Sequence, residues 1–131
     1  MRFGRAVRAA AVASGWLLSA MTTHAECVSP GFNPTGRLCS GCRYEGHMSM
    51  AQDQTCERPY RPNSANSAAI LSNKLVRPAK HGIAGTNNNT FAYKPGQGYV
   101  GKDDFVVEVT FRDLQDNKVG KFQVHWNIDV H

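Results

Sequence analysis

The sequence lacks a strong excess of charge of either sign. Its 131 residues include 15 Lys and Arg against 10 Asp and Glu, a formal charge of +5. Three of the positive charges, Arg2, Arg5 and Arg8, lie before residue 26, and without them 12 basic residues stand against 10 acidic ones. An excess of two charges gives no indication of a nucleic-acid-binding surface, which needs a basic patch.

The chain is also poor in charged residues and has no internal repeat. Charged residues make up 19% of it and hydrophobic residues 41%, a composition that excludes a coiled coil, a collagen and a fully disordered chain. After residue 25 no stretch shows the 3.6-residue period of an amphipathic helix. The length fits one domain with or without tails, so the structure is expected to be built from strands.

No run of residues is long enough and apolar enough to indicate a membrane-spanning helix. The apolar stretch at residues 9–21 has 13 residues, whereas a spanning helix needs about 20. Basic residues precede this stretch, and small residues stand three positions and one position before Glu26, which is the layout of a cleavable secretory signal. We therefore expect residues 1–25 to be a signal peptide and the product to be exported, either periplasmic or secreted.

Four cysteines, Cys27, Cys39, Cys42 and Cys56, lie close together after the predicted signal peptide. An even number of cysteines in an exported chain predicts disulfides, because the compartment is oxidising. Two bridges allow three connectivities, of which we favour Cys27–Cys39 with Cys42–Cys56. Each bridge is expected to stabilise the fold by about 2–4 kcal/mol.

Two other functions for these cysteines are weighed against the structural disulfides. Cys39 and Cys42 have the C-x-x-C spacing of thiol–disulfide oxidoreductases, but neither a helix nor a βαβ unit is indicated around them. A zinc ribbon needs two such pairs, and the sequence has one. The disulfide interpretation is therefore favoured, and a thiol-redox protein stays as the less favoured alternative.

The last third of the chain carries the clearest structural pattern. In residues 104–112 and 121–131, apolar side chains alternate with polar ones, the period of a half-buried strand. Residues 113–120 supply the Asp, Asn and Gly of a hairpin connection. The inward positions expected from this alternation are Phe105, Val107, Val109, Phe111, Phe122, Val124, Trp126, Ile128 and Val130.

Shorter strands are expected earlier in the chain, separated by turn-forming residues. The candidate strands cover residues 44–50, 54–60, 68–76 and 90–93, and residues 81–89 read as a turn or a short edge strand. Short strands with frequent turns predict an all-β sandwich. We divide the chain into the signal peptide at 1–25, an irregular Cys-rich segment at 26–43 and the sandwich domain at 44–131.

Three motifs in residues 68–131 carry a family resemblance. They are Pro78-Ala-Lys-His81-Gly82, Phe91-Ala-Tyr93-Lys-Pro95 and Gly98-Tyr99-Val-Gly101-Lys-Asp103-Asp104-Phe105-Val-Val-Glu-Val109. Together they resemble the bacterial Ig-like, cadherin-like repeat, and the G-Y-x-G-x-D-x-F core is the most specific part. The resemblance implies an Ig-like (cadherin-like) β-sandwich of about seven strands, used outside the cytoplasm for spacing, adhesion or carbohydrate contact. The family often forms tandem arrays, whereas this chain has one copy, and the Cys-rich segment lies outside the pattern.

The same core motif predicts a tight corner from its residue types alone. Gly98 and Gly101 permit a positive φ, and Asp103 can accept backbone N–H bonds that fix the corner. Phe105 is then the first inward residue of its strand. Tyr99 is expected to pack across the corner together with Tyr93, with both hydroxyls bonded at the surface.

Candidate metal ligands are present, but their spacing argues against a site. His125, Asp129 and His131 share one face of a strand. Along an extended strand, however, Asp129 lies about 13 Å from His125, and His131 lies about 20 Å from it. Asp103 and Asp104 lack the D-x-D-x-D pattern of a calcium loop. No metal, cofactor or catalytic residue is therefore assigned.

The function predicted from the sequence is that of an exported, non-enzymatic Ig-like module. It is expected to bind protein or glycan at the cell envelope, with no membrane span once the signal is removed. The alternative is an accessory or structural subunit of a surface assembly that uses an exposed edge strand for pairing.

Overall fold

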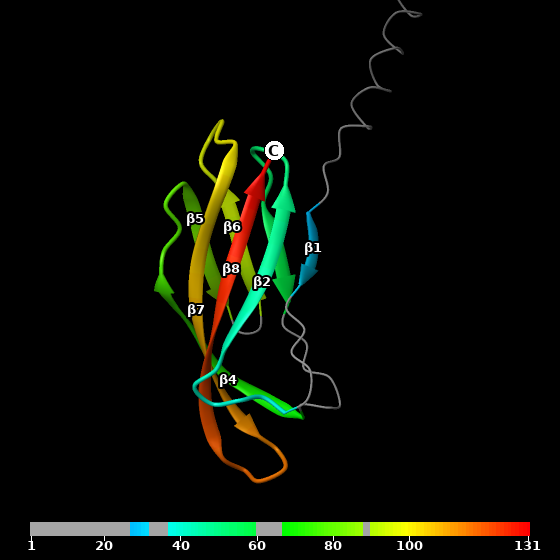
Figure 1. Ribbon diagram of the computed structural model, residues 1–131, viewed down its shortest axis with the longest axis vertical. Coiled ribbons are helices and arrows are strands. Elements are labelled where there is room, and N and C mark those ends of the chain that lie inside the picture. Colours follow the sequence, from blue (N-terminus) through cyan, green and yellow to red (C-terminus); the bar gives the residue numbers. More distant parts are fainter. Residues whose placement is uncertain (1–26, 32–36, 60–66, 88–89) are drawn as a thin grey trace, which may run out of the picture.

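The structure is a computed structural model that describes residues 27–31, 37–59, 67–87 and 90–131 (Figure 1). The predicted signal peptide at residues 1–25 lies outside the described residues. Within the described ranges the chain forms strands and turns and no helix. The all-β prediction is therefore confirmed.

Eight strands are present in the described residues, and they form two sheets. The five-stranded sheet has the order β1-β2-β8-β7-β4, and the three-stranded sheet has the order β3-β6-β5; we call them sheet A and sheet B. The strands are β1 Val28–Gly31, β2 Arg43–Met50, β3 Cys56–Pro59, β4 Ala68–Arg77, β5 Gly82–Asn87, β6 Thr90–Pro95, β7 Gly101–Asp113 and β8 Val119–Val130.

The hairpin of β7 and β8 is the centre of sheet A. The two strands pair without a break from Gly101↔Val130 to Arg112↔Val119. In the turn between them, the Asp113 and Asn117 amides donate to Lys118 O and Asp113 O, each at 2.8 Å. The nine predicted inward side chains of the hairpin are each at most 3% exposed, so the predicted alternation is confirmed.

The core lies between the two sheets, which face each other in Figure 1. From sheet B, the Phe91 ring lies 5.2 Å from Trp126, and the Tyr93 ring lies 6.2 Å from Phe105, centroid to centroid. These contacts join β6 to β8 and β7. Aromatic side chains bury large apolar areas, so this cluster holds the sheets together.

Strand β2 runs parallel to β8, although most of sheet A is antiparallel. Gly46 lies opposite Trp126 in this pairing. A Cβ atom at position 46 would lie 2.7 Å from the Trp126 ring, closer than atoms can pack. The absence of a side chain at Gly46 therefore makes room for the largest side chain of the core.

The pairing of the cysteines differs from the one favoured by sequence. Two disulfides are present, as predicted, but they join Cys27 to Cys56 and Cys39 to Cys42. Cys39 and Cys42 lie in one tight turn, in which the Cys42 amide donates to Cys39 O and Gly41 has a φ of 86°. This turn brings the two cysteines to a Cα separation of 5.4 Å, within the range for a bridge, so the favoured pairing of Cys27 with Cys39 was wrong.

Two predicted boundaries also need correction. Residues 26–43 were expected to be irregular, yet Val28–Gly31 forms β1 on the edge of sheet A, and β2 begins at Arg43. The strand expected from residue 104 begins at Gly101. Hydrogen bonding to a neighbouring strand extends β2 and β7 beyond the residues whose alternation predicts a strand.

The predicted corner before β7 is present. Gly98 and Gly101 have φ values of 76° and 141°, which are unfavourable for other residues. The Tyr99 hydroxyl donates to Lys102 O at 2.5 Å and lies 2.8 Å from where a Cβ at position 101 would be. Phe105 enters the core with no exposed surface.

Candidate functional site

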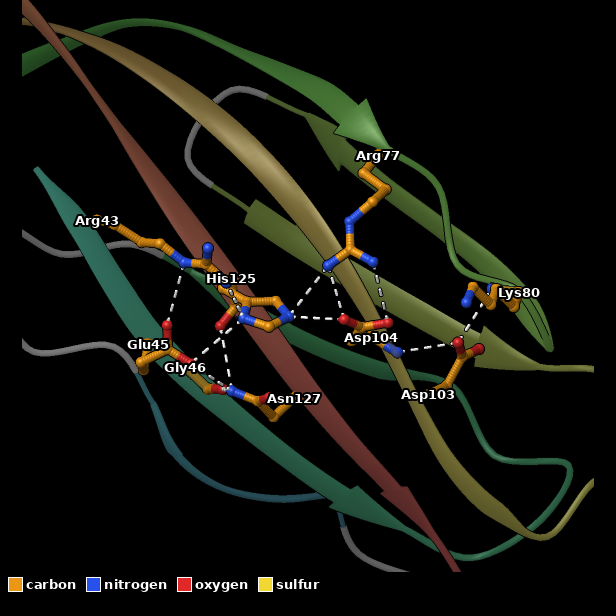
Figure 2. Close-up of polar contacts among 9 residues, drawn as sticks. All are labelled: Arg43, Glu45, Gly46, Arg77, Lys80, Asp103, Asp104, His125 and Asn127. Carbon is orange, nitrogen blue, oxygen red and sulfur yellow. Dashed lines mark hydrogen bonds and ion pairs between the residues drawn. The ribbon is translucent and has the colours of Figure 1, made fainter. Parts of the chain in front are cut away.

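Polar side chains from four strands meet on the outer face of sheet A (Figure 2). One row crosses the sheet from Glu45 on β2 through His125 on β8 and Val106 on β7 to Arg77 on β4. Period-two alternation points these side chains away from the core. With their neighbours they form what we call the outer-face network, which consists of Arg43, Glu45, Arg77, Asp104, His125 and Asn127.

His125 is at the centre of the outer-face network. Its Nε2 lies 2.6 Å from Asp104 Oδ2, and its Nδ1 contacts the Arg43 guanidinium. A guanidinium only donates and a carboxylate only accepts, so Arg43 approaches His125 as a donor at Nδ1 and Asp104 approaches it as an acceptor at Nε2. Glu45 Oε1 lies 3.4 Å from the same Nδ1, so a cationic and an anionic side chain both reach this nitrogen.

Arg77 completes the network from the edge strand β4. It donates to Asp104 Oδ2 at 2.7 Å, and the same guanidinium nitrogen lies 3.2 Å from His125 Nε2. Because Arg77 and His125 are the register partners of Val106 on either side, their contact closes over that side chain. This explains why Val106 is 6% exposed although it is on the outer face.

The carboxylates of the outer-face network are held in their charged form. The pKa of Asp104 is lowered by the hydrogen bond with His125 and then by the one from Arg77. The pKa of Glu45 is lowered chiefly by a hydrogen bond from the Asn127 amide, 3.0 Å away. Both carboxylates are therefore negatively charged at neutral pH, on the outer face of sheet A.

Asp103 makes a second polar centre, at the end of the inner face of β7. It accepts hydrogen bonds from the Lys80, His81 and Asp104 amides and from the Tyr93 hydroxyl, at 2.8–3.0 Å. Burial alone would raise the pKa of Asp103, but these bonds outweigh it and lower the pKa.

Asp103 accepts backbone N–H groups, as predicted, but they come from Lys80, His81 and its neighbour Asp104 and not from the glycine corner. Asp103 ties the loop before β5 to β7, whereas its predicted role was to fix the corner at Gly98 and Gly101. The expectation of a surface partner for the Tyr93 hydroxyl was wrong, since Tyr93 has no exposed surface and donates to Asp103. Burial, and then Asp103, raise the pKa of Tyr93, which keeps the hydroxyl a donor.

An open groove of about 830 Å³ borders both centres. It is lined by residues 47–49 of β2, 80–81, 102–104 of β7 and 127–129 of β8. Among its lining residues, Lys102 pairs with Asp129 on the neighbouring strand at 3.4 Å. The ring of His81 stacks on Tyr99, outside the lining, with centroids 4.4 Å apart. The groove therefore offers ammonium, imidazole, carboxylate and amide groups side by side.

The three residues considered for a metal site do not converge. His125 contacts Asp104, Asp129 pairs with Lys102, and the His131 ring lies 3.4 Å from Ser49 Oγ. Among the described residues, no group of three or more His, Cys, Asp or Glu side chains is placed to hold a metal ion.

Sequence reasoning missed several members of the network. Arg43, Glu45 and Asn127 belong to no recognisable sequence motif, and no polar contact was predicted for Arg77. The signal that was available is the alternation of β8, which places His125 and Asn127 on one face. It does not reveal the parallel neighbour β2, whose residues are about 80 positions away in sequence.

Comparison with known proteins leaves the family open. No protein-family model matches the chain, and a comparison with curated proteins finds no similar sequence. Across the ranges that the structure describes, no helix is suited in length and hydrophobicity to cross a membrane.

Proposed function

We propose that this protein is an exported, non-enzymatic Ig-like module that binds a partner at the cell envelope. The strand order supports the Ig-like assignment. If β2 to β8 are taken as strands A to G, sheet B has the order B-E-D and sheet A contains G-F-C. This is the division of an Ig constant-type sandwich, with the first strand moved to pair beside the last.

Export is supported by the disulfides and by the leader pattern. All four cysteines are oxidised, and no free cysteine is present. Such bridges persist in an oxidising compartment, and residues 1–25 have the layout of a secretory signal.

The groove bordering the outer-face network is the proposed binding site, and a glycan is the partner that its chemistry fits best. The observation that carries this proposal is the mixture of hydrogen-bonding groups along the lining. Sugar hydroxyls both donate and accept, so they suit a surface where carboxylates and amide oxygens accept while Lys80, Lys102 and His81 donate. The internal bonds of Asp103 and Asp104 fix this surface before a ligand arrives, which lowers the entropic cost of binding.

A glycan array probed with the oxidised protein tests this function, with isothermal titration of any hit. We expect Lys102→Ala and Lys80→Ala to weaken binding by about tenfold, since a lost hydrogen bond to a charged group costs about 1.5 kcal/mol. Lys118→Ala is the matched control, because Lys118 lies in the hairpin turn at the far end of β8. Absence of any glycan binding, or an equal loss with Lys118→Ala, would contradict the proposal.

A second candidate, an accessory subunit that pairs through an edge strand, is favoured by strand β5. Edge strands are normally protected by charge, proline, bulges or short length. Strand β4 has Lys74, Arg77 and two irregularities, and β3 has four residues ending in Pro59. Strand β5 has no charged residue, and its Ile83 is 75% exposed.

The β5 edge is tested by a charge placed on it. Gly85 has open space where a Cβ would stand, so Gly85→Lys is expected to fold normally and to prevent strand pairing. Size-exclusion chromatography and pull-down from envelope extract would show loss of an assembly that Val119→Lys, on sheet A, leaves intact. If Gly85→Lys leaves every assembly unchanged, β5 is not the pairing edge.

A further inference from the structure

The two disulfides lie in different surroundings. Cys56 is fully buried, and Cys27 packs against the core. Cys39 is exposed and Cys42 is partly exposed, in a turn between Leu38 and the start of β2. Exposed disulfides are the ones that exchange with external thiols, whereas buried ones are protected.

We propose that the Cys39–Cys42 disulfide is a thiol–disulfide exchange site for an external dithiol, and that Cys27–Cys56 is a structural bridge. This activity is separate from the proposed ligand groove, which is lined by residues 127–129 of β8. The exchange site lies against residues 119–123, at the other end of that strand.

The turn that carries Cys39 and Cys42 is held independently of their bond. The Gly41 amide donates to Lys121 O at 2.7 Å, and the Gln123 amide donates to Cys42 O at 3.0 Å. The Cys39 amide donates to the Tyr44 hydroxyl at 3.2 Å, and the side chain of Leu38 is buried. Because these contacts do not involve sulfur, the two thiols stay near each other after reduction.

Close packing against β8 adds to this support. A Cβ at position 120 would lie 2.9 Å from the Ser40 side chain, so Gly120 lets the turn approach the strand. Ser40 Oγ also accepts a hydrogen bond from the Lys121 amide at 3.3 Å. A turn fixed in this way favours re-formation of the bond, since little chain entropy is lost in closing it.

A second groove, of about 450 Å³, gives the reaction a direction. Cys42 lines it together with two cations, Arg43 and Lys121, and one carboxylate, Glu108, which lies 3.8 Å from Lys121. Cys39 is not in its lining, and the cations outnumber the carboxylate there. Cationic neighbours stabilise a thiolate, and a more stable thiolate leaves faster. The external thiol is therefore expected to attack the more exposed Cys39, and Cys42 is the leaving group.

The exchange balances with a dithiol as reductant. A thiolate of the dithiol attacks Cys39 Sγ, a bond forms between them, and the Cys39–Cys42 bond breaks with its electron pair on Cys42 Sγ. The second thiol of the reductant then attacks the mixed disulfide and releases Cys39 as a thiolate. The reductant ends as a disulfide, the two electrons reside on Cys39 and Cys42, and the reductant's two protons pass through solvent to these thiolates.

The test compares the two disulfides in one native sample. The oxidised protein is incubated with dithiothreitol or with glutathione and sampled over time, and free thiols are alkylated. After denaturation and full reduction the remaining thiols receive a second label, and mass spectrometry assigns each cysteine. We expect Cys39 and Cys42 to be reduced at least tenfold faster than Cys27 and Cys56, with an unchanged circular dichroism spectrum and reoxidation by glutathione disulfide.

Two outcomes would overturn the exchange site. One is reduction of both disulfides at the same rate, or of Cys27–Cys56 first. The other is loss of the folded spectrum when Cys39–Cys42 opens, or failure to reoxidise. A loss of glycan binding has no bearing on either result, so this proposal and the proposed function fail separately.

A separate experiment tests whether the external thiol attacks Cys39 and not Cys42. Glutathione, a monothiol, should leave a mixed disulfide on Cys39 and not on Cys42. Lys121→Gln is expected to slow reduction several-fold, and Lys118→Gln, outside the second groove, to leave it unchanged. Glutathione found on Cys42, or equal rates in the two lysine variants, would overturn the role of the groove.

Discussion

The two faces of the β7–β8 hairpin are built from alternate residues of the same strands, yet they are held in different ways. On the inner face, side chains such as Trp126 and Phe105 are held by close packing and by the register of the strands, and they have almost no exposed surface. On the outer face, His125, Asp104 and Arg77 are held by pairwise polar contacts. The difference indicates that stability resides mainly on the inner face of the hairpin, whereas the polar contacts of the outer face contribute less to it.

The largest expected effect is on the inner face. Trp126→Ala removes the largest buried side chain and its contacts with Phe91 and Phe105. We expect the free energy of unfolding to fall by about 3–5 kcal/mol, measured by urea denaturation. Gln123→Ala, on the exposed face of the same strand, should change it by less than about 0.5 kcal/mol. Similar losses in both variants would contradict the division between the faces.

A smaller loss is expected when a side chain is added instead of removed. Gly46→Ala would place a Cβ 2.7 Å from the Trp126 ring, and such overpacking costs about 1–3 kcal/mol. Gly85→Ala is the matched control, because no atom lies within 4 Å of its new Cβ. Thermal melts of the two variants compare them directly, and an unchanged melt for Gly46→Ala would show that the ring can move aside.

Acid is expected to destabilise the hairpin through Asp103 and Asp104. Their pKa values are lowered in the folded state from the ordinary 3.8, so their stabilisation is complete above that value and is lost as the pH falls through the folded pKa values. Urea denaturation between pH 7 and pH 2 should show this decline. Asp103→Asn should flatten this decline, and Tyr93→Phe should do so in part because it removes one hydrogen bond to Asp103. Slopes equal to that of the unchanged protein would exclude Asp103 as a cause.

The smallest effect on stability is expected on the outer face. The ion pair of Arg77 with Asp104 is partly exposed, and such pairs contribute about 0–1 kcal/mol. Arg77→Gln and Asp104→Asn should therefore lower the free energy of unfolding by no more than about 1 kcal/mol each, and a double-mutant cycle measures their coupling. A coupling as large as the loss in Trp126→Ala would mean that the outer face also holds the fold.

The inner face could be predicted from the sequence, and most of the outer face could not. Residues 121–130 alternate so regularly that the burial of Phe122, Val124 and Trp126 follows from their spacing. The corner at Gly98 and Gly101 was also predictable, because glycine marks positions where φ is positive. The partners of His125 were not, since they come from β2, β7 and β4, and the order of strands in a sheet leaves no local pattern.

By itself, the sequence determined that the chain is all-β, which side chains of its last two strands are inward, and that its cysteines pair. These properties depend on the period of neighbouring residues and on composition. The tertiary structure decided that Cys27 bonds with Cys56, that β2 runs parallel beside β8, and that Arg43, Asp104 and Arg77 surround His125. Such contacts join residues far apart in the chain, so they are set by the path of the backbone through both sheets and not by any local spacing.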